Sequence, residues 1–140
     1  MMDINFNQTT SIRVRYGETD QMGYCYYGNY AQYFEVGRVE ALRLFGMSYK
    51  DMEASGVMLP VSEFSVKYCY PAFYDDLLLV TTKIVSLKGS RLFFEYEIKN
   101  ESDKLISFAS TTLVFVSKET MRPIPPPANF TELMKQYQIN

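Results

Sequence analysis

One long stretch with the period of an α-helix stands in this sequence among segments with the two-residue period of β-strands. From residue 29 to residue 46, apolar side chains recur at steps of three and four, which places them on one helix face. These residues are Tyr30, Tyr33, Phe34, Gly37, Ala41, Leu44 and Phe45. We predict Asn29 as the N-cap and Gly46 as the residue just past the helix end. One long helix among strands predicts an α+β fold.

Gly37 lies in the middle of the apolar helix face. Because glycine weakens a helix interior, we expect the helix to approach another element closely at this point. Two shorter helices are also predicted from capping boxes. Ser48 and Asp51 form the capping box of the first helix, which ends at Gly56. Asn129 and Glu132 form the capping box of the second, a C-terminal helix.

Five segments are predicted as strands, most of them because apolar and polar residues alternate along them. They cover residues 10–19, 61–70, 77–87, 91–99 and 104–117. Short turns join the last four segments, which favours an antiparallel sheet with the long helix lying across it. An open sheet leaves unpaired edges, so we expect pairing with a second copy of the chain.

Composition narrows the function classes. The 140 residues predict a single domain, 1–140, and the net charge of −2 gives no basic surplus for nucleic acid. No apolar run is long enough to span a membrane, and the N-terminus does not resemble a signal peptide. We therefore expect a cytoplasmic protein with Cys25 and Cys69 as reduced thiols. The absence of histidine excludes imidazole-based catalysis and histidine-ligated metals, and neither a metal nor a cofactor is expected.

The segment from residue 13 to residue 38, RVRYGETDQMGYCYYGNYAQYFEVGR, resembles the signature of the 4-hydroxybenzoyl-CoA thioesterase group in the hotdog-fold superfamily. The chain departs from the pattern at Tyr27, where many relatives have histidine, and at Gly28, where a tyrosine-containing variant has proline. The resemblance implies a hotdog fold, in which a curved antiparallel five-stranded sheet wraps around one long central helix. The short C-terminal helix is expected in addition.

The resemblance also implies hydrolysis of an acyl-CoA thioester, with Asp20 in the place of the catalytic acid. A carboxylate there can activate water as a general base or attack the carbonyl itself, and the sequence does not choose between these routes. Tyr27 stands where the family's backbone N–H stabilises the oxyanion. Together with Gly28 it precedes the predicted helix, where N–H groups point outward at the positive helix end.

The remaining candidates for substrate binding lie in two places. Those near the acid are Gly23, Tyr24, Tyr26, Asn29 and Tyr30. A basic turn with Lys88, Ser90 and Arg91 is a candidate for the CoA phosphates.

Structural alternatives stand beside these assignments. Without the surrounding motif, Asp20 would be interpreted as a turn residue that caps Gly23. The tyrosines are equally suited to packing in the core or in a dimer interface. The basic turn is equally well explained as a solvent-exposed turn. Glu35 is a candidate for orienting the site through a hydrogen bond, and the favoured alternative is a solvated or structural ion pair with Arg38. Cys25 is expected to be a small packed apolar residue. Two other functions stay open: an acyl-ACP thioesterase and a non-catalytic acyl-CoA-binding protein. A homodimer or a dimer of dimers is expected in each case.

Overall fold

The computed structural model describes residues 1–139. The helices are α1 (Tyr30–Phe45), α2 (Tyr49–Ala54) and α3 (Ala128–Lys135), and two short 3-10 turns are η1 (Tyr16–Glu18) and η2 (Tyr27–Asn29). The strands are β1 (Met2–Arg13), β2 (Val57–Met58), β3 (Val61–Tyr68), β4 (Leu77–Lys88), β5 (Arg91–Asn100), β6 (Leu105–Val114) and β7 (Val116–Ser117).

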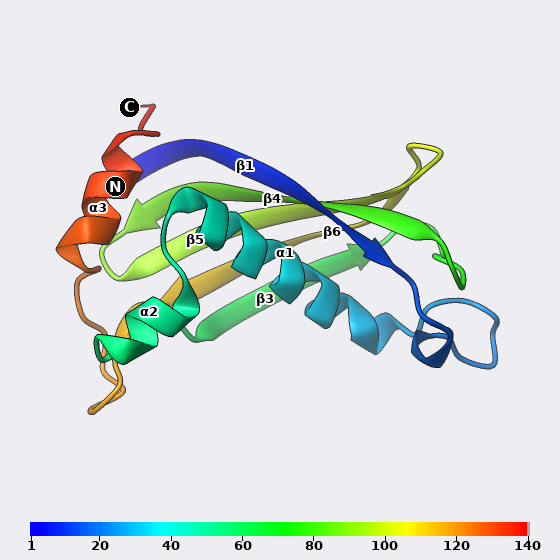
Figure 1. Ribbon diagram of the computed structural model, residues 1–140, viewed down its shortest axis with the longest axis horizontal. Helices are drawn as coiled ribbons and strands as arrows, with labels where there is room; N and C mark the ends of the chain where they lie inside the picture. The colour runs from blue at the N-terminus through cyan, green and yellow to red at the C-terminus, as the bar shows by residue number, and fades with distance from the viewer. Residues whose placement is uncertain (140) are drawn as a thin grey trace.

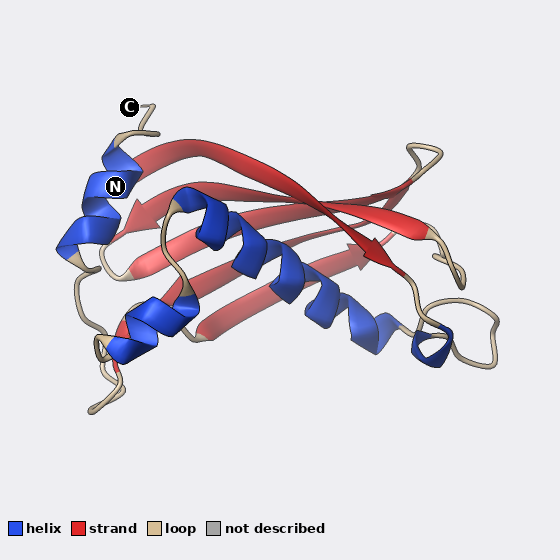
Figure 2. Cartoon of the chain, in the orientation of Figure 1, coloured by secondary structure: helices blue, strands red, loops and turns tan. Residues whose placement is uncertain are grey.

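The main sheet has five antiparallel strands in the order β1-β4-β5-β6-β3. It curves around α1, which lies across its concave face (Figure 1 and Figure 2). The strands β2 and β7 form a separate short ladder. The predicted α+β architecture of one long helix against a five-stranded antiparallel sheet is confirmed. The first strand was predicted at residues 10–19 but lies earlier, because β1 pairs with β4 from Met2, opposite Leu87, to Arg13, opposite Leu77. The predicted strand at residues 14–19 is wrong, since η1 follows there.

The start of α1 differs from the prediction. Asn29 has helical dihedral angles, φ −78° and ψ −17°, and its side chain makes no capping bond. Instead its Nδ2 donates to the carbonyl of Glu18 at 2.8 Å. Tyr26 is the extended residue before the first turn of η2, which runs directly into α1. Asn29 is therefore the residue before the helix, as predicted, but its side chain does not cap it, whereas Gly46 ends the helix with φ 115° as expected.

The buried face of α1 contains the predicted residues except Leu44, which is exposed. Arg38 is buried in addition, because its Nε donates to the Tyr49 hydroxyl at 2.8 Å and its Nη1 to the Tyr96 hydroxyl at 3.2 Å. Glu35 is exposed, and no ion pair within residues 1–139 joins it to Arg38, so the predicted ion pair is wrong.

The shorter helices confirm one capping prediction and correct the other. Ser48 Oγ accepts the N–H of Asp51 at 3.1 Å and so caps α2. Asn129 does not cap α3, because that helix already begins at Ala128 after Pro127. Phe130 of α3 packs against Phe45 at the C-terminal end of α1, with ring centroids 5.4 Å apart.

Gly37 marks the closest approach of α1 to the sheet, as predicted. A Cβ atom built on Gly37 would lie 2.6 Å from Thr82 Oγ1 and 2.8 Å from Val80 Cγ1, both on β4. Such distances are too short for a carbon atom, so only glycine lets α1 lie this close to β4.

We expect Gly37→Ala to destabilise the protein by about 1–3 kcal/mol, because the added methyl group overpacks this contact despite alanine's better helix propensity. Urea denaturation followed by circular dichroism measures the change in the free energy of unfolding. Val36→Ala, at an exposed neighbouring position of α1, is the control. Equal stability of Gly37→Ala and wild type would contradict the close-packing argument.

Candidate active site

The loop between β1 and α1 folds back on itself around Asp20. The N–H of Asp20 donates to the carbonyl of Tyr24 at 3.1 Å, and the N–H of Gly23 donates to the carbonyl of Asp20 at 2.9 Å. One carboxylate oxygen, Oδ1, accepts the N–H of Met22 at 2.9 Å. Gly23 takes the left-handed conformation, φ 85°, that this turn requires. Asp20 thus has the turn role weighed above, and no hydrogen bond within residues 1–139 involves its second carboxylate oxygen.

Two backbone N–H groups at the start of the helix have no acceptor within residues 1–139. In the first 3-10 turn the N–H of Asn29 donates to the carbonyl of Tyr26 at 3.0 Å, and the N–H of Tyr30 donates to the carbonyl of Tyr27. The N–H groups of Tyr27 and Gly28 precede these bonds and remain unpaired, as the first donors of a helix do. Because α1 continues from this turn, they lie at the positive end of its dipole.

Glu18 connects the Asp20 loop to the start of the helix. Its buried carboxylate accepts the N–H of Arg15 at 2.8 Å, Arg15 Nη2 at 3.0 Å and the Tyr33 hydroxyl at 2.9 Å. Its carbonyl accepts the N–H of Tyr26 and Asn29 Nδ2, both at 2.8 Å. Sequence reasoning missed Glu18, since nothing in its local sequence distinguishes a buried acid from one exposed in a turn.

The surroundings of Glu18 shift two pKa values. Burial raises the pKa of Glu18, but the hydrogen bonds from Arg15 and Tyr33 outweigh it and hold the pKa below its ordinary value. Cys25, whose Sγ lies 3.4 Å from the Tyr33 hydroxyl, is buried, and this burial raises the pKa of its thiol. A thiol with a raised pKa is a poor nucleophile, which agrees with the expectation that Cys25 packs as a small apolar residue.

A cavity of about 360 Å³ lies beside this loop. Its lining comes from the loop, the first turns of the helix, the end of β3 and the segment that follows it: Met22, Tyr24, Cys25, Tyr27, Tyr30, Tyr68, Cys69, Tyr70 and Pro71. Asp20 is hydrogen-bonded to the backbone of two lining residues, Met22 and Tyr24. Its size and its aromatic lining suit a small apolar ligand group. Of the predicted tyrosines, Tyr24 and Tyr30 line the cavity and Tyr26 does not.

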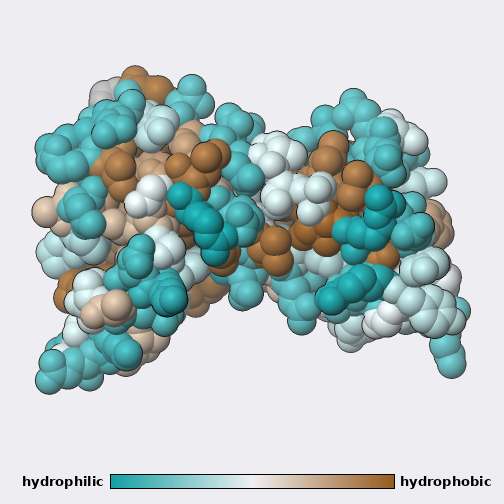
Figure 3. Space-filling model, viewed as in Figure 1, coloured by the Kyte–Doolittle hydropathy of each residue, from teal (hydrophilic) through white to brown (hydrophobic). Residues whose placement is uncertain are grey.

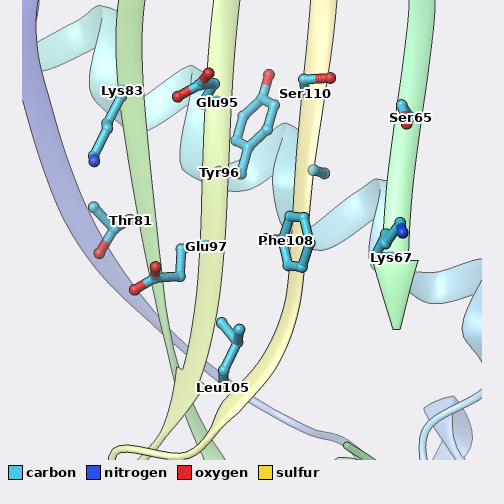
Figure 4. A pocket seen from close by; sticks show the side chains of 11 residues that line it. Ser65, Lys67, Thr81, Lys83, Glu95, Tyr96, Glu97, Leu105, Phe108 and Ser110 are labelled. Atoms are coloured by element: carbon cyan, nitrogen blue, oxygen red, sulfur yellow. The ribbon is translucent and has the colours of Figure 1, made fainter. Parts of the chain in front are cut away.

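A larger hollow, of about 460 Å³, lies on the face of the sheet opposite α1. Figure 4 shows side chains of both charges there, among them Lys83, Glu95 and Glu97, with Phe108 beside them. None of the predicted site residues lines this hollow.

The basic turn predicted for CoA phosphates lies far from Asp20 within one chain. Lys88 and Arg91 flank the tight turn between β4 and β5, at the end of the sheet where β1 begins. The Asp20 loop follows the other end of β1 (Figure 1). Ser90 also has a structural contact, because its Oγ donates to the carbonyl of Ile124 at 2.7 Å. One chain therefore does not bring these two groups of predicted residues together.

Comparison with known proteins decides the family. The sequence pattern of the thioesterase superfamily matches residues 22–107 of this chain. The chain belongs to the thioesterase superfamily. Acyl-CoA thioester hydrolase YbgC of Escherichia coli O157:H7 is 33% identical over 125 residues, which are 89% of this chain and 93% of that protein. The prediction of a thioester hydrolase family is thus confirmed.

Solved structures confirm the fold. A DHNA-CoA thioesterase from Staphylococcus aureus superimposes with a TM-score of 0.89 at 35% identity, over 93% of this chain and 89% of the other. A variant of 4-hydroxybenzoyl-CoA thioesterase in complex with 4-hydroxybenzoyl-CoA superimposes with a TM-score of 0.83 at 20% identity, over 91% and 98%. The predicted hotdog fold is confirmed. Within residues 1–139, no helix combines the length and the apolar composition that crossing a membrane requires.

The lowered pKa of Glu18 gives a prediction on acid stability. A carboxyl group whose pKa is lower in the folded than in the unfolded protein stabilises the fold above its unfolded pKa of about 4.3. This contribution is lost as the pH falls through the folded pKa. We expect wild type to lose free energy of unfolding below about pH 4.3 relative to Glu18→Gln, which lacks the titrating group. Urea denaturation at a series of pH values measures it.

Glu53→Gln, at an exposed position of α2, is the control. A stability difference between wild type and Glu18→Gln that stays constant down to pH values well below 4 would contradict the assignment.

Proposed function

We propose that the protein is an acyl-CoA thioesterase, and that its reaction takes place between the Asp20 loop and the start of the helix. The observation that carries this proposal is the pair of unpaired N–H groups, Tyr27 and Gly28, beside a loop carboxylate and an aromatic cavity. Thioester hydrolysis needs a group that delivers oxygen to the carbonyl carbon and donors for the oxyanion that forms. Both can be supplied here without histidine.

Asp20 has two possible routes in this proposal. As a general base it takes a proton from water, whose oxygen then attacks the carbonyl carbon. As a nucleophile it attacks that carbon itself and forms an anhydride, which water cleaves in a second step. In both routes the carbon–sulfur bond breaks, and CoA leaves as a thiolate that takes up a proton. The N–H groups of Tyr27 and Gly28 would hold the carbonyl oxygen, and each well-placed donor is worth about 3 kcal/mol.

The acyl group would occupy the 360 Å³ cavity, with Tyr24 and Tyr30 in its wall. Gly23 and Asn29 shape the site through the backbone turn and the bond to the Glu18 carbonyl, and neither residue lines the cavity. Tyr26 packs its ring over Gly28, since a Cβ atom on Gly28 would lie 2.6 Å from Tyr26 Cε2. Tyr26 is thus suited to shielding the oxyanion donors from one side.

The working unit in this proposal is a pair of chains joined through β3. This edge strand has almost no buried residue, and Val61, Phe64 and Tyr68 are exposed large side chains. Apolar surface is also exposed on the face that carries α1 (Figure 3), including Val36 and Leu44. Antiparallel pairing of two β3 edges would complete a continuous sheet, as a two-fold symmetric dimer requires.

Such a pair would also explain the distant basic turn. Antiparallel edge pairing turns the second chain by half a turn. Its Lys88, Ser90 and Arg91 then come to the end of the joint sheet that carries the first chain's Asp20. The CoA phosphates would bind to this turn from the second chain. Two free cysteines, Cys25 and Cys69, agree with a cytoplasmic location.

We expect Asp20→Asn to lower kcat by about 100-fold or more with little change in KM, because the amide can neither accept a proton nor attack the carbonyl. Release of free thiol from a panel of acyl-CoA thioesters measures the rate. Asp51→Asn, in the first turn of α2, is the matched control and should keep wild-type kinetics.

Wild-type turnover by Asp20→Asn would remove Asp20 from the mechanism, and a wild type that binds acyl-CoA without product would favour the non-catalytic alternative. Thioesters of the same acyl group on acyl carrier protein complete the panel. If the thioesters on acyl carrier protein are hydrolysed faster than the CoA thioesters, the natural substrate is carried by that protein and not by CoA.

We expect Phe64→Lys to shift the protein to monomers and to lower kcat/KM at least tenfold, because it places a charge in the β3 interface. Sedimentation equilibrium measures the oligomeric state. Phe108→Lys, equally exposed but on the opposite face of the sheet, should keep the β3 dimer. Fully active monomers of Phe64→Lys would contradict the two-chain site.

A further inference from the structure

We infer that Glu18 is a positioning residue that holds the Asp20 carboxylate and the Tyr27 and Gly28 amides in one fixed arrangement. The inference rests on the proposed function and adds a residue to it that neither the sequence pattern nor the comparisons point to. Its basis is that Glu18 stands two residues before Asp20 and makes hydrogen bonds to Tyr33 in the helix and to the residues on either side of the amide pair, Tyr26 and Asn29.

The side chain of Glu18 fixes the loop to α1. The Tyr33 hydroxyl, one turn into the helix, donates to Glu18 Oε1 at 2.9 Å, and both groups are buried. The same oxygen accepts the N–H of Arg15 at 2.8 Å, which closes η1 just before the loop. A buried carboxylate with three donors has little freedom to move, so the chain entering the Asp20 loop is held against the helix.

The backbone of Glu18 fixes the oxyanion donors from both sides. Its carbonyl accepts the N–H of Tyr26, the residue before Tyr27, at 2.8 Å. It also accepts Asn29 Nδ2, from the residue after Gly28, at 2.8 Å. The two unpaired amides are therefore held between two bonds to one oxygen atom. A displacement of Glu18 would move the amides relative to Asp20, and a misplacement of about 1 Å is enough to cost a large part of the rate.

Charge balance supports this role. A second carboxylate close to Asp20 would disfavour the negative charge that develops on the thioester oxygen. Arg15 Nη2 lies 3.0 Å from Glu18 Oε2 and offsets that charge. Glu18 can therefore bind the helix through a strong charge-assisted hydrogen bond without adding net negative charge to the site.

The test compares Glu18→Gln and Tyr33→Phe with wild type in steady-state hydrolysis of acyl-CoA and in amide hydrogen exchange. We expect kcat to fall about 100-fold in Glu18→Gln and about tenfold in Tyr33→Phe, with KM within about threefold of wild type. Exchange should become faster in residues 19–29, whose N–H groups include that of Tyr26, and stay unchanged in the strands of the sheet.

Two matched controls separate positioning from stability. Glu40→Gln removes the ion pair with Arg43 on the surface of α1, and Tyr49→Phe removes a half-buried hydroxyl bonded to Arg38. Both should keep wild-type kcat and wild-type exchange in residues 19–29. Tyr33→Phe is the milder change and serves if Glu18→Gln does not fold.

Three outcomes would overturn the inference. The first is wild-type kcat in both Glu18→Gln and Tyr33→Phe. The second is a loss of kcat accompanied by faster exchange throughout the sheet, which would make Glu18 a residue of general stability. The third is a wild type that hydrolyses none of the thioesters, and this alone would overturn the proposed function as well.

Discussion

The contact of Gly37 with β4 is the constraint on which the rest of the structure depends. The absence of a side chain at Gly37 lets α1 lie directly on Val80 and Thr82, and the sheet curves around the helix at that distance. The aromatic residues of α1 then fill the space between helix and sheet, as Phe34 does against Tyr96 with ring centroids 5.1 Å apart. Once the helix is fixed to the sheet, the position of its first turn is fixed too.

The packing of α1 determines where the first turn of the helix, and so the proposed site, lies. A helix start has unpaired N–H groups by construction, and here they follow directly after the loop that carries Asp20. The loop is joined to the helix by hydrogen bonds of Glu18 and Asn29 as well as by the packing of Cys25. Hydrogen bonds have narrow ranges of distance and angle, so they define positions more sharply than apolar contacts do. This suits a site in which a carboxylate and two amides must act on one carbonyl group.

The absence of histidine fits this arrangement. In sites that use imidazole, one side chain accepts and returns the proton. In the proposed site a carboxylate delivers oxygen to the carbonyl carbon and backbone N–H dipoles stabilise the oxyanion, so no imidazole is required. The buried thiol of Cys25 and the phenol of Tyr33 are both held neutral, because burial raises their pKa values. The negative charge of Glu18 is offset by Arg15.

The sequence by itself determined the order of elements, the apolar face of α1, the close approach at Gly37 and the family. The first three follow from periodicity and short-range spacing, which are properties of neighbouring residues, and the family follows from the resemblance of residues 13–38 to its signature. Only the tertiary structure decided that Glu18 and Arg38 are buried, that Asn29 binds a carbonyl instead of capping the helix, and that the turn at Lys88 lies at the far end of the sheet from Asp20. The physical reason is that a polar side chain is buried only where distant segments supply its partners. Arg38 finds the hydroxyl of Tyr96, 58 positions away, and no local pattern encodes that contact.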